Sequence, residues 1–139
     1  MREILFKAKR DGSGEWVEGC YAECKGKTFI GIGISICIDA FKGFCTPAIR
    51  WFEVAPETLC QFTGLCDKNG KRIWENDIIQ YGAVAAVVKF GEYGNGNLGF
   101  YVDFPEETNY RKDFSYWAKK VVVIGNAVDD RSLLQEVLE

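Results

Sequence analysis

The chain contains no histidine, and this absence removes several kinds of chemistry at once. Without an imidazole there is no histidine-activated serine or cysteine nucleophile, no histidine metal ligand and no usual general base at neutral pH. No other pattern of residues defines a catalytic set or a cofactor-binding motif in a suitable context. The sequence therefore predicts a protein that is not an enzyme, with no catalytic residues and no cofactor.

Positive charge and long apolar runs are also scarce. The net charge is −3: residues 1–70 carry nine basic and nine acidic side chains, and residues 71–139 carry eight and eleven. Binding to a phosphate backbone needs a basic excess, so nucleic acid is the weaker alternative as a partner. The longest apolar run, Phe29–Ile38, has half of the roughly 20 residues of a membrane-spanning helix. With no secretory signal at the N-terminus, we expect a cytoplasmic protein without a membrane partner.

The six cysteines show no convincing zinc-binding spacing. Cys20 and Cys24 come closest, but on a strand they would lie about 13 Å apart, too far to share one ion. We therefore predict no metal. In a cytoplasmic chain, cysteines are expected to be mostly small buried apolar residues with free thiols, and the sequence leaves open whether any pair is oxidised.

Glycine and aromatic residues are plentiful, whereas proline occurs only three times, a balance that favours strands and tight turns. The clearest pattern alternates isoleucine with small residues from Ile30 to Ile38. Period two over this length predicts a strand whose isoleucine face lies in the core. The opposite face, formed by small residues, leaves room for a close neighbour, which is another backbone, an aromatic ring or a partner. We expect this strand to be paired on both sides, within the chain or across an oligomer interface, and so predict a homo-oligomer.

Other segments read as short strands, turns and one helix. Residues 4–22 predict a hairpin, and Phe41–Pro47 predicts a loop. Gly94, Gly96 and Gly99 match a dinucleotide-binding string, but a hairpin loop fits better because no helix follows. The long linker Pro105–Trp117 predicts a functional excursion, a short helix or a lid. The remaining predicted strands are 49–54, 60–65, 72–74, 77–81, 83–90, 98–104 and 120–124, and the predicted C-terminal helix is 131–138.

The densest polar run, Glu57–Tyr81, reads as two successive turns with apolar anchors. Asp67 is expected to bond the amides of the first turn, and Asn76 suits a left-handed position in the second. Asp67, Glu75 and Asp77 could instead form a carboxylate cluster for a cation, which the sequence leaves open. The residues assigned to this motif, with a structural role favoured, are Gln61, Thr63, Gly64, Asp67, Asn69, Gly70, Trp74, Glu75 and Asp77.

This run resembles the YopX family of phage and prophage proteins. The residues that carry the resemblance are Gln61-Phe62-Thr63-Gly64-Leu65, Asp67, Asn69-Gly70, Ile73-Trp74-Glu75 and Asp77-Ile78-Ile79. The opening Arg2–Arg10 with Gly14–Gly19, and the closing Ile124-Gly125-Asn126, are similar too. The resemblance implies a mainly β fold with a barrel-like C-terminal part and a working place in the cytoplasm of the bacterial host. It implies no known activity.

Together, these patterns and what the YopX resemblance implies predict a mainly β fold, α+β by element count. An N-terminal β layer joins a small SH3-like, barrel-like C-terminal β unit with a short C-terminal helix. We expect one compact domain over residues 1–139, with a possible subdivision into 1–56 and 57–139. The predicted function is a protein-interaction module of a phage or prophage, with a host or phage protein as partner. A nucleic-acid-binding barrel face is the alternative. The predicted interaction surface consists of Tyr110, Arg111, Lys112 and Trp117.

Overall fold

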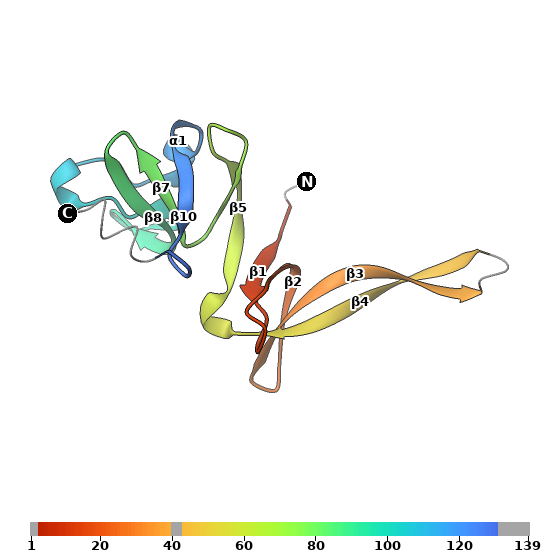
Figure 1. Cartoon of the computed structure of the whole chain (residues 1–139). Coiled ribbons are helices and arrows are strands. Elements are labelled where there is room, and N and C mark those ends of the chain that lie inside the picture. The colour runs from red at the N-terminus through yellow and green to blue at the C-terminus, as the bar shows by residue number, and fades with distance from the viewer. Residues whose placement is uncertain (1–2, 40–42, 131–139) are drawn as a thin grey trace. The chain divides into compact units, whose positions relative to one another are not determined.

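The computed structural model describes residues 3–39 and 43–130 and confirms the mainly β fold (Figure 1). The strands form two antiparallel sheets, and the chain divides into two compact units. Unit 1 is Glu3–Gln61, and unit 2 begins at Phe62. This division falls inside one strand, whereas the predicted subdivision lies between residues 56 and 57.

Unit 1 is a sheet with the strand order β4-β3-β2-β1-β5. Ala8, Ile30 and Val54 form its buried cluster, with Phe6 and Tyr21 among the half-buried side chains packed against it. The hairpin predicted over residues 4–22 is confirmed, because β1 and β2 pair from Phe6 with Gly19 onward. The elements are β1 (Phe6–Lys9), β2 (Trp16–Cys24), β3 (Lys27–Asp39), β4 (Phe44–Val54), the 3₁₀ helix η1 (Pro56–Thr58) and β5 (Cys60–Cys66), which continues into unit 2.

The turn between β2 and β3 uses two residues in the left-handed region. Lys25 has φ 52° and Gly26 has φ 79°. Two successive positive φ values give a hairpin turn whose twist matches that of the flanking strands. This turn sets the register in which Cys24 lies opposite Lys27.

Strand β3 is confirmed, and its pairing within the chain changes along its length. Strand β2 accompanies it only as far as the pair Cys20 and Gly31, whereas β4 accompanies it to Asp39. Pairing on both sides within the chain is therefore confirmed up to Gly31, and pairing across an oligomer interface beyond Gly31 stays a prediction. Residues 32–39 of β3 and 44–51 of β4 are called the arm here, and Figure 1 shows β3 and β4 running on together beyond the other strands of unit 1.

The loop predicted over Phe41–Pro47 is wrong from Phe44 onward, because β4 already begins there. Pro47 lies opposite Ser35 inside the ladder. Strand β4 is the edge strand of its sheet, and an edge tolerates a proline whose nitrogen faces away from the neighbouring strand. The proline therefore marks an edge strand and does not prevent one.

Unit 2 contains a four-stranded sheet with the order β10-β7-β8-β9. The end of β5 pairs with β6, and Lys68 N–H donates to Val121 O next to β10. The elements of unit 2 after β5 are β6 (Arg72–Trp74), β7 (Asp77–Tyr81), β8 (Val84–Tyr93), β9 (Asn97–Val102), the 3₁₀ helix η2 (Glu106–Thr108), the helix α1 (Phe114–Trp117), the 3₁₀ helix η3 (Ala118–Lys120) and β10 (Val122–Asn126).

The sheet of unit 2 is buried on both faces. Ile79, Ala86 and Val88 point into the main cluster. Ile78 and Val87 point into a second cluster on the opposite face. The rest of the main cluster consists of Ile73, Val102, Phe104, Phe114, Trp117, Ala118, Val121 and Val123.

The linkers of unit 2 are shorter or more structured than the sequence predicts. Strand β8 runs to Tyr93, so the linker predicted to begin at Glu92 begins too early. Gly94 and Gly96 lie in the β8–β9 hairpin turn and Gly99 lies in β9, as the hairpin interpretation requires. The linker Pro105–Trp117 contains η2 and α1, which matches the short-helix alternative.

The expectation that the cysteines are mostly buried is wrong. Only Cys60 is buried; Cys66 is half-buried, and the other four are exposed. The four exposed cysteines lie on β2, β3 and β4, which have little core to face. The helix predicted over 131–138 lies outside the described residues. Within the described ranges, no helix has the length and apolar character needed to cross a bilayer.

Candidate functional site

The polar motif between β5 and β7 is organised by the Asp67 carboxylate. Asp67 Oδ1 accepts the N–H groups of Asn69 at 2.8 Å and Lys71 at 2.9 Å. Its Oδ2 accepts the N–H of Val123, 56 residues away, at 3.0 Å. One buried carboxylate thus closes the turn after β5 and binds it to β10.

The surroundings of Asp67 favour its charged form. Burial by itself raises the pKa of this carboxyl, because desolvation penalises the charge. The three backbone N–H donors, together with the Lys71 ammonium, outweigh burial and lower the pKa below the ordinary value. Asp67 is therefore a charged hydrogen-bond acceptor whose known donors are backbone amides.

Two other motif side chains, those of Thr63 and Asp77, also bond the backbone of unit 2. Thr63 Oγ1 donates to Ile73 O at 2.7 Å, and Asp77 Oδ2 accepts the N–H of Trp74 at 2.8 Å. Asn76 takes the left-handed conformation, with φ 72°, and Ala127 N–H donates to its carbonyl. Gly64 and Gly70 occur at positive φ, Gln61 pairs with Phe6 in unit 1, and Glu75 is half-buried beside the second turn.

The alternative of a cation cluster, which the sequence left open for Asp67, Glu75 and Asp77, is not assembled. In residues 3–39 and 43–130, no group of three or more cysteine, aspartate or glutamate side chains is placed to hold a metal ion. Asp67 and Asp77 instead accept from backbone amides near opposite ends of β6. The motif supplies local structure, and the chemistry that it offers is hydrogen bonding to the backbone.

The predicted surface at Tyr110 is a cluster of aromatic side chains that pack on the buried ring of Trp117. The Trp117 ring lies 5.4 Å from the Tyr110 ring and 4.9 Å from the Tyr81 ring. Trp117 is only 5% exposed, and its Nε1 donates to Arg111 O at 2.7 Å. Trp117 is therefore a buried support of this surface, while Tyr81, Tyr110 and Tyr116 are its exposed rings.

Cations lie against the exposed aromatic rings. Arg111 and Lys120 each stand 4.4 Å from the centre of the Tyr116 ring. Arg111 also donates two hydrogen bonds to Asp113, at 2.7 and 2.9 Å. These bonds lower the pKa of Asp113 against the effect of its burial. Shallow depressions of about 300 and 470 Å³ flank Tyr110, and Lys112 lines both of them.

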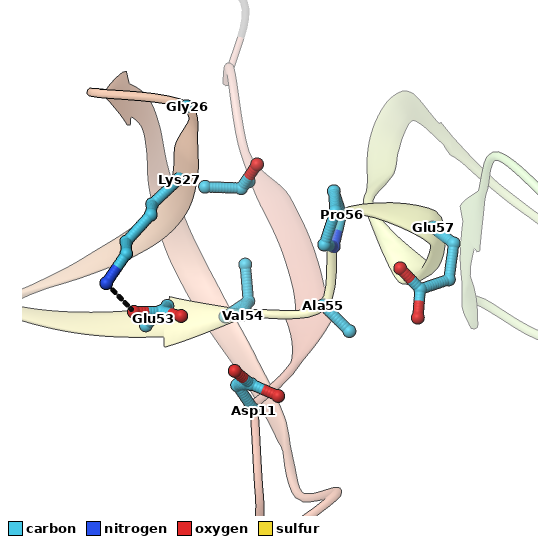
Figure 2. A pocket seen from close by; sticks show the side chains of 9 residues that line it. Asp11, Gly26, Lys27, Glu53, Val54, Ala55, Pro56 and Glu57 are labelled. Atoms are coloured by element: carbon cyan, nitrogen blue, oxygen red, sulfur yellow. Dashed lines mark ion pairs between the residues drawn. The ribbon is translucent and has the colours of Figure 1, made fainter.

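Unit 1 has a polar pocket of about 200 Å³ at the ends of β3 and β4. Figure 2 shows the Lys27 ammonium directed at the Glu53 carboxylate, and the two groups lie 3.5 Å apart. Asp11 and Glu57 line the same pocket. Since Lys27 already neutralises Glu53 and the pocket is open, it offers no enclosed site for a ligand.

The arm exposes large apolar side chains on both of its faces. Ile34 and Ile36 are 41% and 47% exposed on one face, and Ile49 and Trp51 are 51% and 46% exposed on the other. Gly31 provides space for the second face, because a Cβ there would come within 2.6 Å of Ile49 and 2.8 Å of Trp51. The prediction that the small-residue face admits an aromatic ring is therefore confirmed.

A depression at the base of the arm adds to its apolar surface. It has a volume of about 370 Å³ and is lined by Ala22, Cys24, Phe29 and Trp51. All four residues come from β2, β3 and β4 of unit 1. Trp51 thus belongs to the arm and also lines this depression.

The sequence matches a known protein family over most of its length. The family model described as YopX protein matches residues 13–135. The chain belongs to the YopX family. No curated protein matches it. The YopX match spans both the polar motif and the whole arm, so it covers each candidate region described above.

Sequence reasoning about this YopX protein missed the second apolar face of the arm. Ile49 and Trp51 alternate with Arg50 and Phe52 in a segment too short to show which face is covered. A signal was present in the sequence, because the glycines at 31 and 33 leave room for large side chains on their face, and at Gly31 the structure uses that room. Their partners in the ladder are Trp51 and Ile49.

Proposed function

We propose that this YopX protein is a non-enzymatic protein-interaction module that binds its partner through the arm. The observation that supports this most directly is the exposure of Ile34, Ile36, Ile49 and Trp51 on a ribbon of two strands. Exposed apolar residues gathered in one place mark interaction surfaces in soluble proteins.

The arm is also expected to have low stability on its own. A two-stranded ribbon is marginally stable in water at best, and a third strand or a packed layer normally supports it. Past Gly31, β2 no longer pairs with β3, and the exposure of Ile34, Ile36, Ile49 and Trp51 shows that, among the described residues, no layer covers either face of the arm at these positions. A bound partner would supply the missing layer.

The outer edge of β3 is the better binding edge. Strand β4 carries Pro47, which has no N–H to donate to an added strand. The outer edge of β3 from Ile32 to Cys37 has no proline and no charged residue. Extended segments add to such edges through main-chain hydrogen bonds, and alternate side chains then give specificity.

A second copy of the chain fits this edge. Two β3 strands related by a two-fold axis can pair antiparallel, because such an interface uses the same surface twice. Each copy brings Ile32, Ile34 and Ile36 to one face of the joined sheet, and no charge on this segment opposes the pairing. The proposed partners are thus a second copy and, for the same edge, a strand of a host or phage protein.

The proposal that the protein is not an enzyme is supported by the state of the two best candidates for a catalytic carboxylate, because both are already hydrogen-bond acceptors within the fold. The carboxylates of Asp67 and Asp77 accept hydrogen bonds from backbone amides. Membership of the YopX family supports an accessory role in a phage or prophage, exercised in the cytoplasm of the bacterial host.

Sedimentation of the purified chain tests the proposal. We expect concentration-dependent association, and we expect the double substitution Ile34→Lys with Ile36→Lys to weaken it at least about tenfold, because it places charges on the joined face. Leu98→Lys is the matched control. It also replaces an exposed apolar residue of a strand, at 75% exposure, but lies in unit 2.

A wild-type chain that stays monomeric at high concentration would contradict self-association. The protein-partner part is then tested by capture from host lysate. We expect a stoichiometric partner with wild type and with Leu98→Lys, but not with the doubly substituted arm. Capture that is insensitive to the arm would refute the proposed binding edge.

Nucleic-acid binding is the second candidate, and the Tyr116 region favours it. Exposed rings beside Arg111 and Lys120 could stack on bases and meet phosphates. Filter binding of single-stranded DNA at low and moderate salt is the test. We expect retention at low salt that weakens on Tyr116→Ala, and absence of retention at low salt removes this candidate.

A further inference from the structure

Two cysteines face each other across the arm. Cys37 on β3 and Cys45 on β4 are direct partners in the ladder, and their Sγ atoms lie 3.1 Å apart. Both side chains are exposed. They form the last regular pair before the register shifts between Cys37 and Asp39.

The backbone here suits a disulfide. Directly opposed residues in antiparallel strands have Cα atoms about 4.5–5.5 Å apart, and a disulfide needs about 4.4–6.8 Å. Among the described cysteines on strands of unit 1, this geometry is specific to Cys37 and Cys45. Cys20 lies opposite Gly31, and Cys24 lies opposite Lys27.

We propose that Cys37 and Cys45 are a redox-active dithiol whose substrate is a low-molecular-weight disulfide. The thiolate of one cysteine attacks a sulfur of the small disulfide, which forms a mixed disulfide and releases one small thiol. The second cysteine then attacks the protein sulfur of that mixed disulfide and releases the second small thiol. The protein loses two electrons and two protons, and the small disulfide gains them.

The product would be a covalent closure near the end of the arm. It would fix the pairing of β3 with β4 at the position where the register shifts, because Cys37 and Cys45 could no longer separate. The reaction requires only the two exposed thiols. It therefore does not depend on whether the arm binds a partner.

The chain is well suited to a direct test by mass spectrometry. Trypsin cuts after Lys42, so Cys37 and Cys45 fall on separate peptides, 28–42 and 43–50, that stay joined only by a disulfide. Cys20 and Cys24 share the peptide 11–25. The folded chain is equilibrated with glutathione disulfide at fixed glutathione, quenched, alkylated and digested.

We expect the two peptides to become linked in monomeric protein. Linkage should require at least about tenfold less glutathione disulfide than glutathione addition to Cys20 or Cys24, because the second exchange is intramolecular. In Cys45→Ser, Cys37 should instead take up glutathione at the concentration that modifies Cys20. The control Cys24→Ser should leave the linkage unchanged.

Two results would overturn the proposal. One is separate glutathione adducts on Cys37 and Cys45 at the concentration that modifies Cys20, without linked peptides. The other is linked peptides found only in covalent dimers on a non-reducing gel. Circular dichroism of each variant verifies that the strands are retained, so an effect of misfolding is recognised.

Discussion

Unit 1 and unit 2 are both built from antiparallel strands, yet they treat their apolar side chains differently. In unit 2, Ile78 and Ile79 follow each other on β7, and both are completely buried, on opposite faces of the sheet. In unit 1, Ile30 is completely buried, but Ile34 and Ile36 on the same face of the same strand are not. A strand pattern thus fixes which side chains share a face, while neighbouring strands and layers determine whether that face is covered.

The largest effect is expected when the carboxylate that organises unit 2 is removed. Asp67→Ala leaves three backbone N–H groups without their acceptor, and the N–H of Val123 is buried, so we expect a loss of about 3 kcal/mol in the free energy of unfolding. The loss in the free energy of unfolding is measured by urea unfolding, monitored through amide hydrogen exchange in β7 and β8.

Asp103→Ala is the control for this substitution. Asp103 is 44% exposed and pairs with Lys89 on the surface, so its loss should cost less than about 1 kcal/mol. Equal effects of the two substitutions would mean that Asp67 does not organise unit 2 as described.

A smaller effect on stability is expected at the base of the arm. Gly31→Ala places a Cβ against Ile49 and Trp51, and overpacking of this kind costs about 1–2 kcal/mol or displaces the side chains. Gly33→Ala, on the same face two residues on, meets nothing within 4 Å and should be nearly neutral.

The measurements for this pair are the unfolding midpoint and the emission of Trp51 in a chain whose other tryptophans are replaced by phenylalanine. A change in Trp51 emission for Gly31→Ala but not for Gly33→Ala is the expected result. Identical emission in both variants would show that Trp51 does not lie over Gly31 in solution.

The smallest effect is expected from the titration of the Asp67 carboxyl, which changes the free energy of unfolding only at acid pH. Its pKa in the folded chain lies below the ordinary 3.8, so its charge contributes stability that is present above 3.8 and is lost as the pH falls through the folded pKa. The stability gap between wild type and Asp67→Asn should therefore be constant above pH 5 and narrow below about 3.8.

The same titration of Asp103→Asn serves as the reference for general acid effects. A gap between wild type and Asp67→Asn that widens on acidification would reverse the sign and contradict the hydrogen-bonding scheme of Asp67.

Much of the local structure could be predicted from the sequence, because it depends on neighbouring residues. The alternation from Ile30 to Ile38 indicated β3, and the left-handed Asn76 followed from turn chemistry. Strand β4 was predicted too short because a proline such as Pro47 favours a loop in the sequence. Only the sheet topology shows that Pro47 lies in an edge strand, where a proline is tolerated.

The missed features depend on contacts between distant residues. The bond from Asp67 to Val123 joins positions 56 residues apart, and no local pattern indicates it. The pairing of Cys37 with Cys45 depends on the register of the arm, which a shift of one residue would change. The cysteines were predicted to be buried because the sequence does not show that the arm has no layer over it.

Pro47 also bears on how many chains an assembly through the arm can contain. Filaments grow when each strand has two usable edges, because every added chain presents a fresh one. In the arm, one edge of β3 is taken by β4, and the outer edge of β4 lacks a donor at Pro47. In the proposed pair of β3 strands, the two edges that remain would both carry a proline. Pro47 would then stop further addition of strands and limit the proposed assembly to a closed pair.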